Sequence, residues 1–84
     1  TIVGAREFAR NGIRVNTIAP GLFGTPMLLG MPQDVQESLA ASVPYPSRFG
    51  MPEEYAKLVM SILDNVMLNG ETIRLDGAIR MQPR

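Results

Sequence analysis

The chain has 84 residues, enough for one small domain, and its eight lysines and arginines balance eight aspartates and glutamates. This neutral charge, with no basic stripe, argues against nucleic-acid binding. The sequence has neither cysteine nor histidine, which excludes disulfides, thiolate metal sites and histidine-based catalysis. Its longest apolar runs fall far short of the roughly 20 residues that cross a bilayer, so no membrane span is expected.

The first predicted elements are a helix and a strand in close succession. Residues 2–10 carry apolar side chains at helical spacing, namely Ile2, Ala5, Phe8 and Ala9. Asn11 and Gly12 stop this helix, because both tolerate the left-handed backbone found after a helix C-terminus. Residues 13–19 (IRVNTIA) are β-branched and mostly apolar, which predicts a strand that ends at Pro20-Gly21.

Two further helices are predicted after an irregular loop. The loop covers residues 22–31, where Gly24, Pro26 and Gly30 interrupt large apolar side chains. A helix over residues 33–43 follows, with Pro32 before it and one apolar face made of Val35, Leu39, Ala40 and Val43. Residues 51–63 form the clearest helix, with Pro52 and two acidic residues in the first turn and an apolar stripe of Tyr55, Leu58, Val59, Ile62 and Leu63.

The last predicted element is a strand over residues 71–75, between an Asn69-Gly70 turn and Asp76-Gly77. Two strands joined by helices must run parallel if they pair. Parallel sheets are buried on both faces and normally need more than two strands. The helix–strand–helix–helix–strand order therefore predicts a piece of a larger α/β domain, with the rest of that domain upstream.

Three blocks of the sequence resemble patterns of the short-chain dehydrogenase/reductase family. They are residues 12–21 (GIRVNTIAPG) with Thr25 four positions later, residues 48–56 (RFGMPEEYA) and residues 69–78 (NGETIRLDGA). Ala78 stands where the family pattern has a second glycine. The resemblance implies that residues 1–84 form the C-terminal part of a single Rossmann-like, doubly wound parallel-sheet domain.

Within the family, the segments APGLFGTP, VPYPSR and LDGAIRMQP most resemble the type 2 3-hydroxyacyl-CoA dehydrogenases. That group also acts on 17β-hydroxysteroids and uses NAD. The alternative is a 3-oxoacyl-carrier-protein reductase-like enzyme that uses NADP. The resemblance implies an acyl-CoA or steroid-like small-molecule substrate and a homo-oligomer, dimer or tetramer. With no signal peptide in the first ten residues, we expect a cytoplasmic protein, or a mitochondrial-matrix protein in a eukaryote.

No catalytic residue is expected in this chain. The family uses a tyrosine followed four residues later by a lysine, but Phe49 follows Tyr45 at that spacing and Val59 follows Tyr55. Both tyrosines are therefore interpreted as packing residues. A glycine-rich phosphate loop is also missing from the sequence. We expect the chain to be inactive by itself, and a non-catalytic truncated or interaction chain is the competing hypothesis.

The expected cofactor-binding residues follow the first strand, because open α/β sheets bind ligands beyond the carboxyl ends of their strands. They are Pro20, Gly21, Leu22, Phe23 and Thr25. By resemblance, the backbone of Phe23 meets the nicotinamide carboxamide and the hydroxyl of Thr25 meets the pyrophosphate. The alternative is that these residues only form a turn.

The apolar residues of the next segment are expected to form a substrate lid. They are Met27, Leu28, Leu29 and Met31. The alternative is that they pack permanently onto the core. Asp76 is expected to have a structural role at the end of the second strand, and Arg74 and Arg80 are candidates for a subunit contact.

Overall fold

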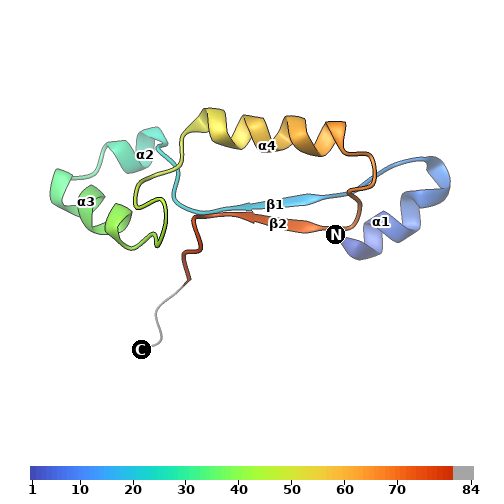
Figure 1. The fold of residues 1–84 in the computed structure, drawn as a ribbon, viewed down its shortest axis with the longest axis horizontal. Coiled ribbons are helices and arrows are strands. Elements are labelled where there is room, and N and C mark those ends of the chain that lie inside the picture. Colours follow the sequence, from blue (N-terminus) through green and yellow to red (C-terminus); the bar gives the residue numbers. More distant parts are fainter. Residues whose placement is uncertain (81–84) are drawn as a thin grey trace.

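The computed structural model describes residues 1–80. Its elements follow the order α1 (Ile2–Phe8), η1 (Ala9–Asn11), β1 (Thr17–Pro20), α2 (Pro26–Leu29), α3 (Gln33–Ala41), α4 (Pro52–Asp64) and β2 (Thr72–Leu75) (Figure 1). The predicted helix–strand–helix–helix–strand order is confirmed, with α2 as an additional single turn. The first strand is shorter than predicted, since its partner β2 begins only at Thr72 and no strand of the described residues lies beside residues 13–16.

The two strands form a parallel pair, as predicted. Thr17 lies opposite Thr72, and the register runs to Pro20 opposite Leu75. Helix α4 lies along one face of the pair (Figure 1). On the other face no helix covers the strands within residues 1–80. Parallel sheets are normally covered on both faces, and residues 1–80 supply a helix on only one face of this strand pair.

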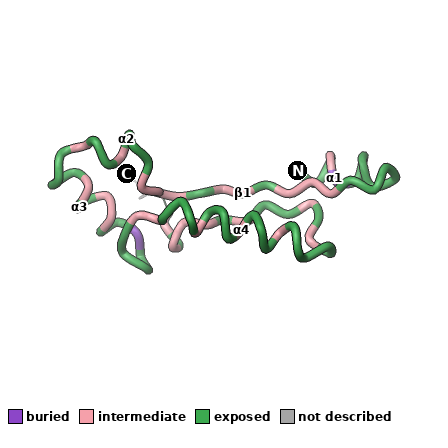
Figure 2. Tube along the Cα trace, turned by 90° about the horizontal axis from the view of Figure 1, so that it is seen from above, coloured by how far each residue is buried: buried purple, intermediate pink, exposed green. Residues whose placement is uncertain are grey.

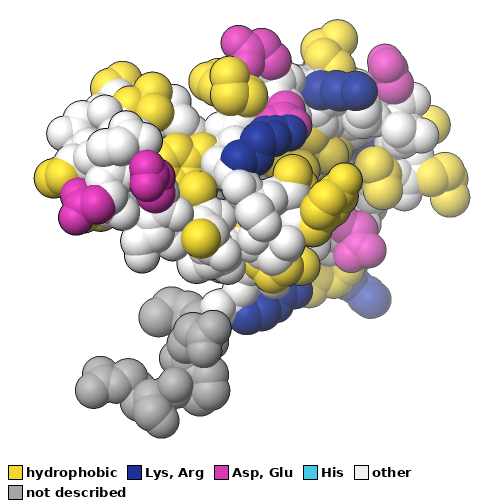
Figure 3. Space-filling view, turned by 60° about the vertical axis from the view of Figure 1, so that its left-hand side comes forward, with side chains coloured by type: hydrophobic (Ala, Val, Ile, Leu, Met, Phe, Trp, Pro, Cys, Tyr) yellow, Lys and Arg dark blue, Asp and Glu magenta, His cyan; other side chains and the backbone are white. Residues whose placement is uncertain are grey.

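The described part of the chain has almost no core. Within residues 1–80 only Ala5 and Val43 are buried (Figure 2). The surface area is 6471 Å², whereas a folded monomer of this size exposes about 4,900 Å². Hydrophobic side chains also lie open to solvent beside the charged ones (Figure 3). Much of the apolar surface in residues 1–80 is therefore left uncovered.

Helix α4 is confirmed, but its apolar stripe is only partly covered. Leu58 and Ile62 are half-buried against the strands, while Val59 and Leu63 are exposed. Pro52 at the start and the acidic first turn are present as predicted. No helix within residues 1–80 is both long and apolar enough to span a bilayer.

The segment before β1 ties the sheet to the far end of α4. The Arg14 guanidinium donates to the carbonyl oxygens of Ile62 (3.0 Å), Asn65 (3.1 Å) and Leu68 (3.1 Å). These carbonyls lie at or just beyond the helix C-terminus, where a cation is favoured and acceptors lack helical partners. Asn16 donates to the Leu68 carbonyl oxygen at 2.9 Å. Residues expected to be strand thus serve as a cap for α4.

Candidate functional site

The first part of the site is a loop, residues 20–25, at the carboxyl end of β1. The Gly21 N–H donates to the Leu75 carbonyl oxygen at 3.0 Å. A Cβ on Gly21 would lie only 2.6 Å from the Cβ of Asp76, so no side chain fits there. From the sequence, Gly21 was expected among the cofactor-binding residues. The structure gives a separate reason for a glycine here, because the ends of β1 and β2 pack together at this position.

Gly50 holds the middle of the 20–25 loop. Its N–H donates to the Leu22 carbonyl oxygen at 2.8 Å, and its own carbonyl oxygen accepts the Gly24 N–H at 2.9 Å. The Phe23 ring lies directly over it, since a Cβ on Gly50 would come within 2.6 Å of that ring. Sequence analysis did not assign Gly50 to the site, although the block RFGMPEEYA contains it.

The Phe23 side chain points toward α4 and leaves part of its backbone available. Its ring makes an edge-to-face contact with Tyr55, at 6.1 Å between centroids and 87° between planes. Its carbonyl oxygen accepts the Thr25 N–H at 2.8 Å. Within residues 1–80 the N–H groups of Leu22 and Phe23 donate to no acceptor. These two backbone N–H groups are therefore without a partner in the described part of the chain.

Thr25 starts the short helix α2. Its hydroxyl oxygen accepts the Leu28 N–H at 3.4 Å, a long capping bond, and Pro26 occupies the first helical position. Thr25 is exposed, so its hydroxyl hydrogen can donate to an anion. The prediction of an irregular loop was wrong at residues 26–29. The Thr25-Pro26 pair was the signal for this helix start.

The four expected lid residues lie on and just after α2. Met27 is 76% exposed and Leu29 is 56% exposed, whereas Leu28 and Met31 are half-buried. Helices α2 and α3 project beyond the ends of the strands (Figure 1). The Gln36 amide donates to the carbonyl oxygens of Leu29 (3.0 Å) and Met31 (2.8 Å). These bonds join α2 and α3 into one unit.

Val43 anchors the C-terminal end of the unit that α2 and α3 form. The predicted helix extended to Val43, but α3 ends at Ala41. Val43 is buried because it packs against the turn after β2, where a Cβ on Gly77 would lie 2.5 Å from its Cγ1. The Tyr45 N–H donates to the Gly77 carbonyl oxygen at 3.2 Å. The Tyr45 side chain, expected to pack, is 83% exposed, while Tyr55 is 38% exposed and contacts the Phe23 ring.

An ion pair lies next to Gly50. The two guanidinium nitrogens of Arg48 contact the two carboxylate oxygens of Glu54 at 2.8 and 2.9 Å. The carboxylate also accepts the Met51 N–H at 2.7 Å. The hydrogen bond from Arg48, followed by the one from Met51, lowers the pKa of Glu54 to about 2. The pair therefore stays ionised throughout the neutral pH range.

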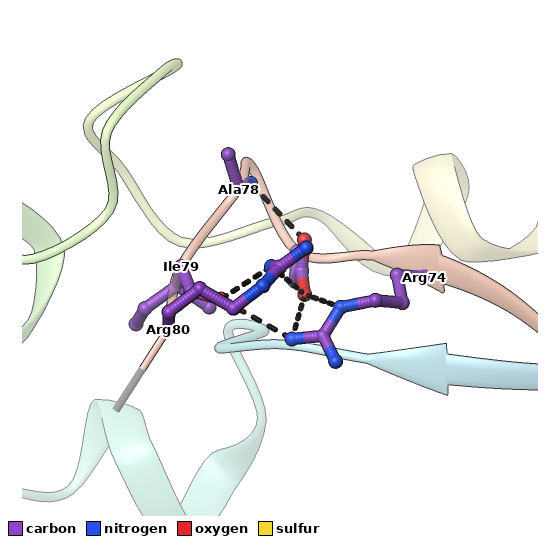
Figure 4. A network of polar contacts seen from close by, with 5 residues as sticks. Arg74, Ala78, Ile79 and Arg80 are labelled. Atoms are coloured by element: carbon purple, nitrogen blue, oxygen red, sulfur yellow. Dashed lines mark hydrogen bonds and ion pairs between the residues drawn. The ribbon is translucent and has the colours of Figure 1, made fainter. Parts of the chain in front are cut away.

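Asp76 organises the turn after β2 (Figure 4). One carboxylate oxygen accepts the Ala78 N–H at 3.0 Å, and the other pairs with Arg74 at 2.8 Å and Arg80 at 3.3 Å. Burial alone would raise the pKa of Asp76, but the Ala78 N–H and the two arginines lower it overall. These contacts agree with the structural role expected for Asp76. Both arginines turn toward it, and a role for them at a subunit contact stays a prediction.

A cavity of about 90 Å³ lies between the 20–25 loop, Gly50 and the end of β2. The residues that line this cavity are Leu22, Phe23, Val43, Pro46, Arg48, Gly50, Glu54, Leu75, Asp76 and Gly77. The cavity means that the loop is not packed solidly from this side. Hydrogen bonds at its edges, to Leu75 and Gly50, hold it in place.

Comparison with known proteins identifies relatives along almost the whole chain. A family model described as "Enoyl-(Acyl carrier protein) reductase" matches residues 2–79. The 3-hydroxyacyl-CoA dehydrogenase type-2 proteins of Bos taurus and Homo sapiens are each 63% identical over 83 residues. The match covers 99% of this chain and 32% of each relative.

A solved structure shows the same fold. The crystal structure of 3-hydroxyacyl-CoA dehydrogenase type-2 from Mycobacterium avium matches with a TM-score of 0.93 and 44% identity. The match covers all of this chain and 33% of the chain in that structure. The Rossmann-like prediction is therefore confirmed. The chain spans about a third of the length of the relatives that it matches.

Proposed function

The chain belongs to the short-chain dehydrogenase/reductase family, and from this premise we propose that it forms the nicotinamide and substrate side of an oxidoreductase. The reaction is hydride transfer between NAD and a 3-hydroxyacyl-CoA or hydroxysteroid-type secondary alcohol. The 63% identity to 3-hydroxyacyl-CoA dehydrogenase type-2 supports the hydroxyacyl-CoA class, and the hydroxysteroid class rests on the resemblance to that group. The choice of NAD over NADP rests on the resemblance to that group.

The observation that carries the proposed role of this segment is the pair of unused N–H groups in the 20–25 loop. Leu22 and Phe23 present them just beyond the carboxyl end of a parallel strand, where such sheets bind ligands. A nicotinamide carboxamide offers the carbonyl oxygen that such donors need. The exposed Thr25 hydroxyl offers a further donor for a phosphate oxygen.

Each group of residues has a distinct task in this proposal. When bound, the nicotinamide supplies or accepts the hydride. The Phe23 N–H orients the carboxamide and the Thr25 hydroxyl binds the pyrophosphate. The exposed side chains of Met27 and Leu29, with Leu28 and Met31 beside them, cover the acyl or steroid body of the substrate and exclude water. The acid–base residues come from upstream.

The test uses a full-length protein, prepared from its gene or as a chimera in which residues 1–84 replace the matching part of the human relative. Formation of NADH is followed with a 3-hydroxyacyl-CoA and NAD, and again with NADP. Turnover with NAD is expected. Activity only with a 3-oxoacyl-carrier-protein and NADPH would instead favour the reductase alternative.

Residues 1–84 alone serve as the second arm of the same experiment. They lack the tyrosine–lysine pair, so no turnover above background is expected. Turnover that survives repurification would contradict the assignment of catalysis to upstream residues. Failure of a folded full-length protein to bind any nicotinamide dinucleotide would contradict the proposed function itself.

A further inference from the structure

The position of the two free N–H groups in the 20–25 loop depends on Gly50. Both backbone hydrogen bonds that reach the middle of the loop, at Leu22 and Gly24, come from this one residue. The cavity of about 90 Å³ borders the loop, so the loop is not packed from that side and is held there by these hydrogen bonds and by the contact of the Phe23 ring with Gly50. A shift of Gly50 would therefore shift the Leu22 and Phe23 donors with it.

Gly50 is in turn held by the Arg48–Glu54 ion pair, which binds the chain on both sides of it. Before Gly50, the Arg48 guanidinium donates to the Phe49 carbonyl oxygen at 3.0 Å. After it, the Glu54 carboxylate accepts the Met51 N–H at 2.7 Å. The two side chains are joined by two parallel hydrogen bonds, the geometry that gives a carboxylate–arginine pair its directional strength.

The side chains of this pair are 49% and 43% exposed. Ion pairs this exposed usually contribute little to global stability. A function in stability alone therefore does not explain why the joined pair makes two hydrogen bonds to the peptide groups on either side of a single glycine. The pair is better placed to fix a local backbone position than to stabilise the whole fold.

We propose that Arg48 and Glu54 are positioning residues for the cofactor loop. They fix the backbone around Gly50, and Gly50 fixes the N–H donors of Leu22 and Phe23 at the place where the nicotinamide carboxamide binds. This inference rests on the proposed function for the identity of the ligand. The mechanical link from the ion pair to the loop rests on the hydrogen bonds alone.

The experiment compares Arg48→Met, Glu54→Gln and their double variant in the full-length protein. Glu53→Gln is the matched control, because it removes a carboxylate from the same helical turn and makes no ion pair within residues 1–80. Dissociation constants are measured for NADH and for AMP, which carries only the adenosine end. Binding of NADH should weaken about three- to tenfold in the variants, because small misplacement of binding groups is costly.

Three features distinguish positioning from a general structural effect. Affinity for AMP should stay at the wild-type value in every variant. The double variant should bind NADH no more weakly than either single variant, because the two side chains act as one unit. Arg48→Lys should fall between wild type and Arg48→Met, since it keeps the charge but loses the paired geometry. Equal losses for NADH and AMP, or a loss equally large in Glu53→Gln, would overturn the proposal.

Amide hydrogen exchange tests the link without any ligand. In the ligand-free full-length protein, the Gly24 and Gly50 amides should exchange faster in Arg48→Met and Glu54→Gln than in wild type or Glu53→Gln. Unchanged exchange at both glycines would overturn the positioning role whatever the cofactor is. Faster exchange in a protein that binds no dinucleotide would support the mechanical link and overturn the proposed function instead.

Discussion

The Arg14 guanidinium donates to the Ile62 carbonyl oxygen at 3.0 Å across 48 residues of sequence. The same nitrogen also lies 3.1 Å from the carbonyl oxygens of Asn65 and Leu68. One side chain therefore connects the segment before β1 to the end of α4 and to the turn that leads into β2.

Substitution of Arg14 should destabilise the fold. Arg14→Met keeps much of the side-chain volume but removes the donor to the Ile62 carbonyl oxygen and a second donor from the Asn65 and Leu68 carbonyl oxygens, at an expected cost of about 1–3 kcal/mol. Urea denaturation of the full-length protein measures the loss. Arg10→Met is the control, because the Arg10 side chain makes no hydrogen bond or ion pair within residues 1–80. Equal stability of the Arg14 and Arg10 variants would show that the cap contributes nothing.

Replacing Ala78 by glycine should stabilise the protein. Ala78 has a φ of 71°, a left-handed conformation that costs a residue with a Cβ about 1–2 kcal/mol. The greater freedom of glycine in the unfolded chain offsets part of this gain, so a net increase of about 0.5–1 kcal/mol is expected. The same change at Ala56, inside α4, should instead destabilise by about 0.5–1 kcal/mol. In thermal denaturation, the midpoint temperature should rise for Ala78→Gly and fall for Ala56→Gly.

The Thr25 hydroxyl should matter for cofactor binding more than for folding. Its only bond within residues 1–80 is the 3.4 Å cap to Leu28, so Thr25→Ala should leave the denaturation midpoint nearly unchanged. Loss of one hydrogen bond to a charged pyrophosphate costs about 1.5–3 kcal/mol, or about ten- to a hundredfold in NAD affinity. Thr25→Ser keeps the hydroxyl and should be milder. Equal NAD affinity in wild type and Thr25→Ala by titration would remove Thr25 from the site.

Acid should uncouple the Arg48–Glu54 pair in a defined pH window. The pKa of Glu54 is lowered from 4.5 to about 2, so the folded state favours the ionised carboxylate. The stabilisation is complete above about pH 4.5 and decreases as pH falls toward 2, where the carboxylate becomes protonated. Because the pair is exposed, the difference in urea midpoint between wild type and Glu54→Gln should be small and constant near neutral pH, and it should shrink across this window. A difference that grows on acidification would contradict the assignment.

Helices α2 and α3 should move as a lid between two anchors. The unit has no buried residue in α3, is tied internally by Gln36, and is fixed at Gly24 and Val43. Hydrogen exchange should be fast across residues 26–42 in the free full-length protein and slower in the ternary complex. Strong and equal protection in both states would mean that the segment is permanent structure and that Met27 and Leu29 do not cover the substrate.

Local patterns in the sequence determined the elements and their order. Helical spacing in residues 51–63, the strand character of ETIRL and the need for a helical crossover predicted α4, β2 and the parallel pairing. These features depend on neighbours a few positions away, which the sequence shows directly. The family blocks also pointed to the 20–25 loop, though its contact with a cofactor stays a prediction. The same local reasoning overlooked the turn that begins at Thr25 and extended the first strand too far.

Only the tertiary structure decided what the polar residues contact. Arg14 and Asn16 looked like strand residues, yet their side chains bind carbonyl oxygens near Leu68. Gly50 was given no role from the sequence, yet it holds the loop around Phe23. Such contacts join positions far apart in the chain, and the spacing of apolar residues along the sequence does not predict them. They form because a buried or half-buried donor or acceptor must find a partner once packing has brought the segments together.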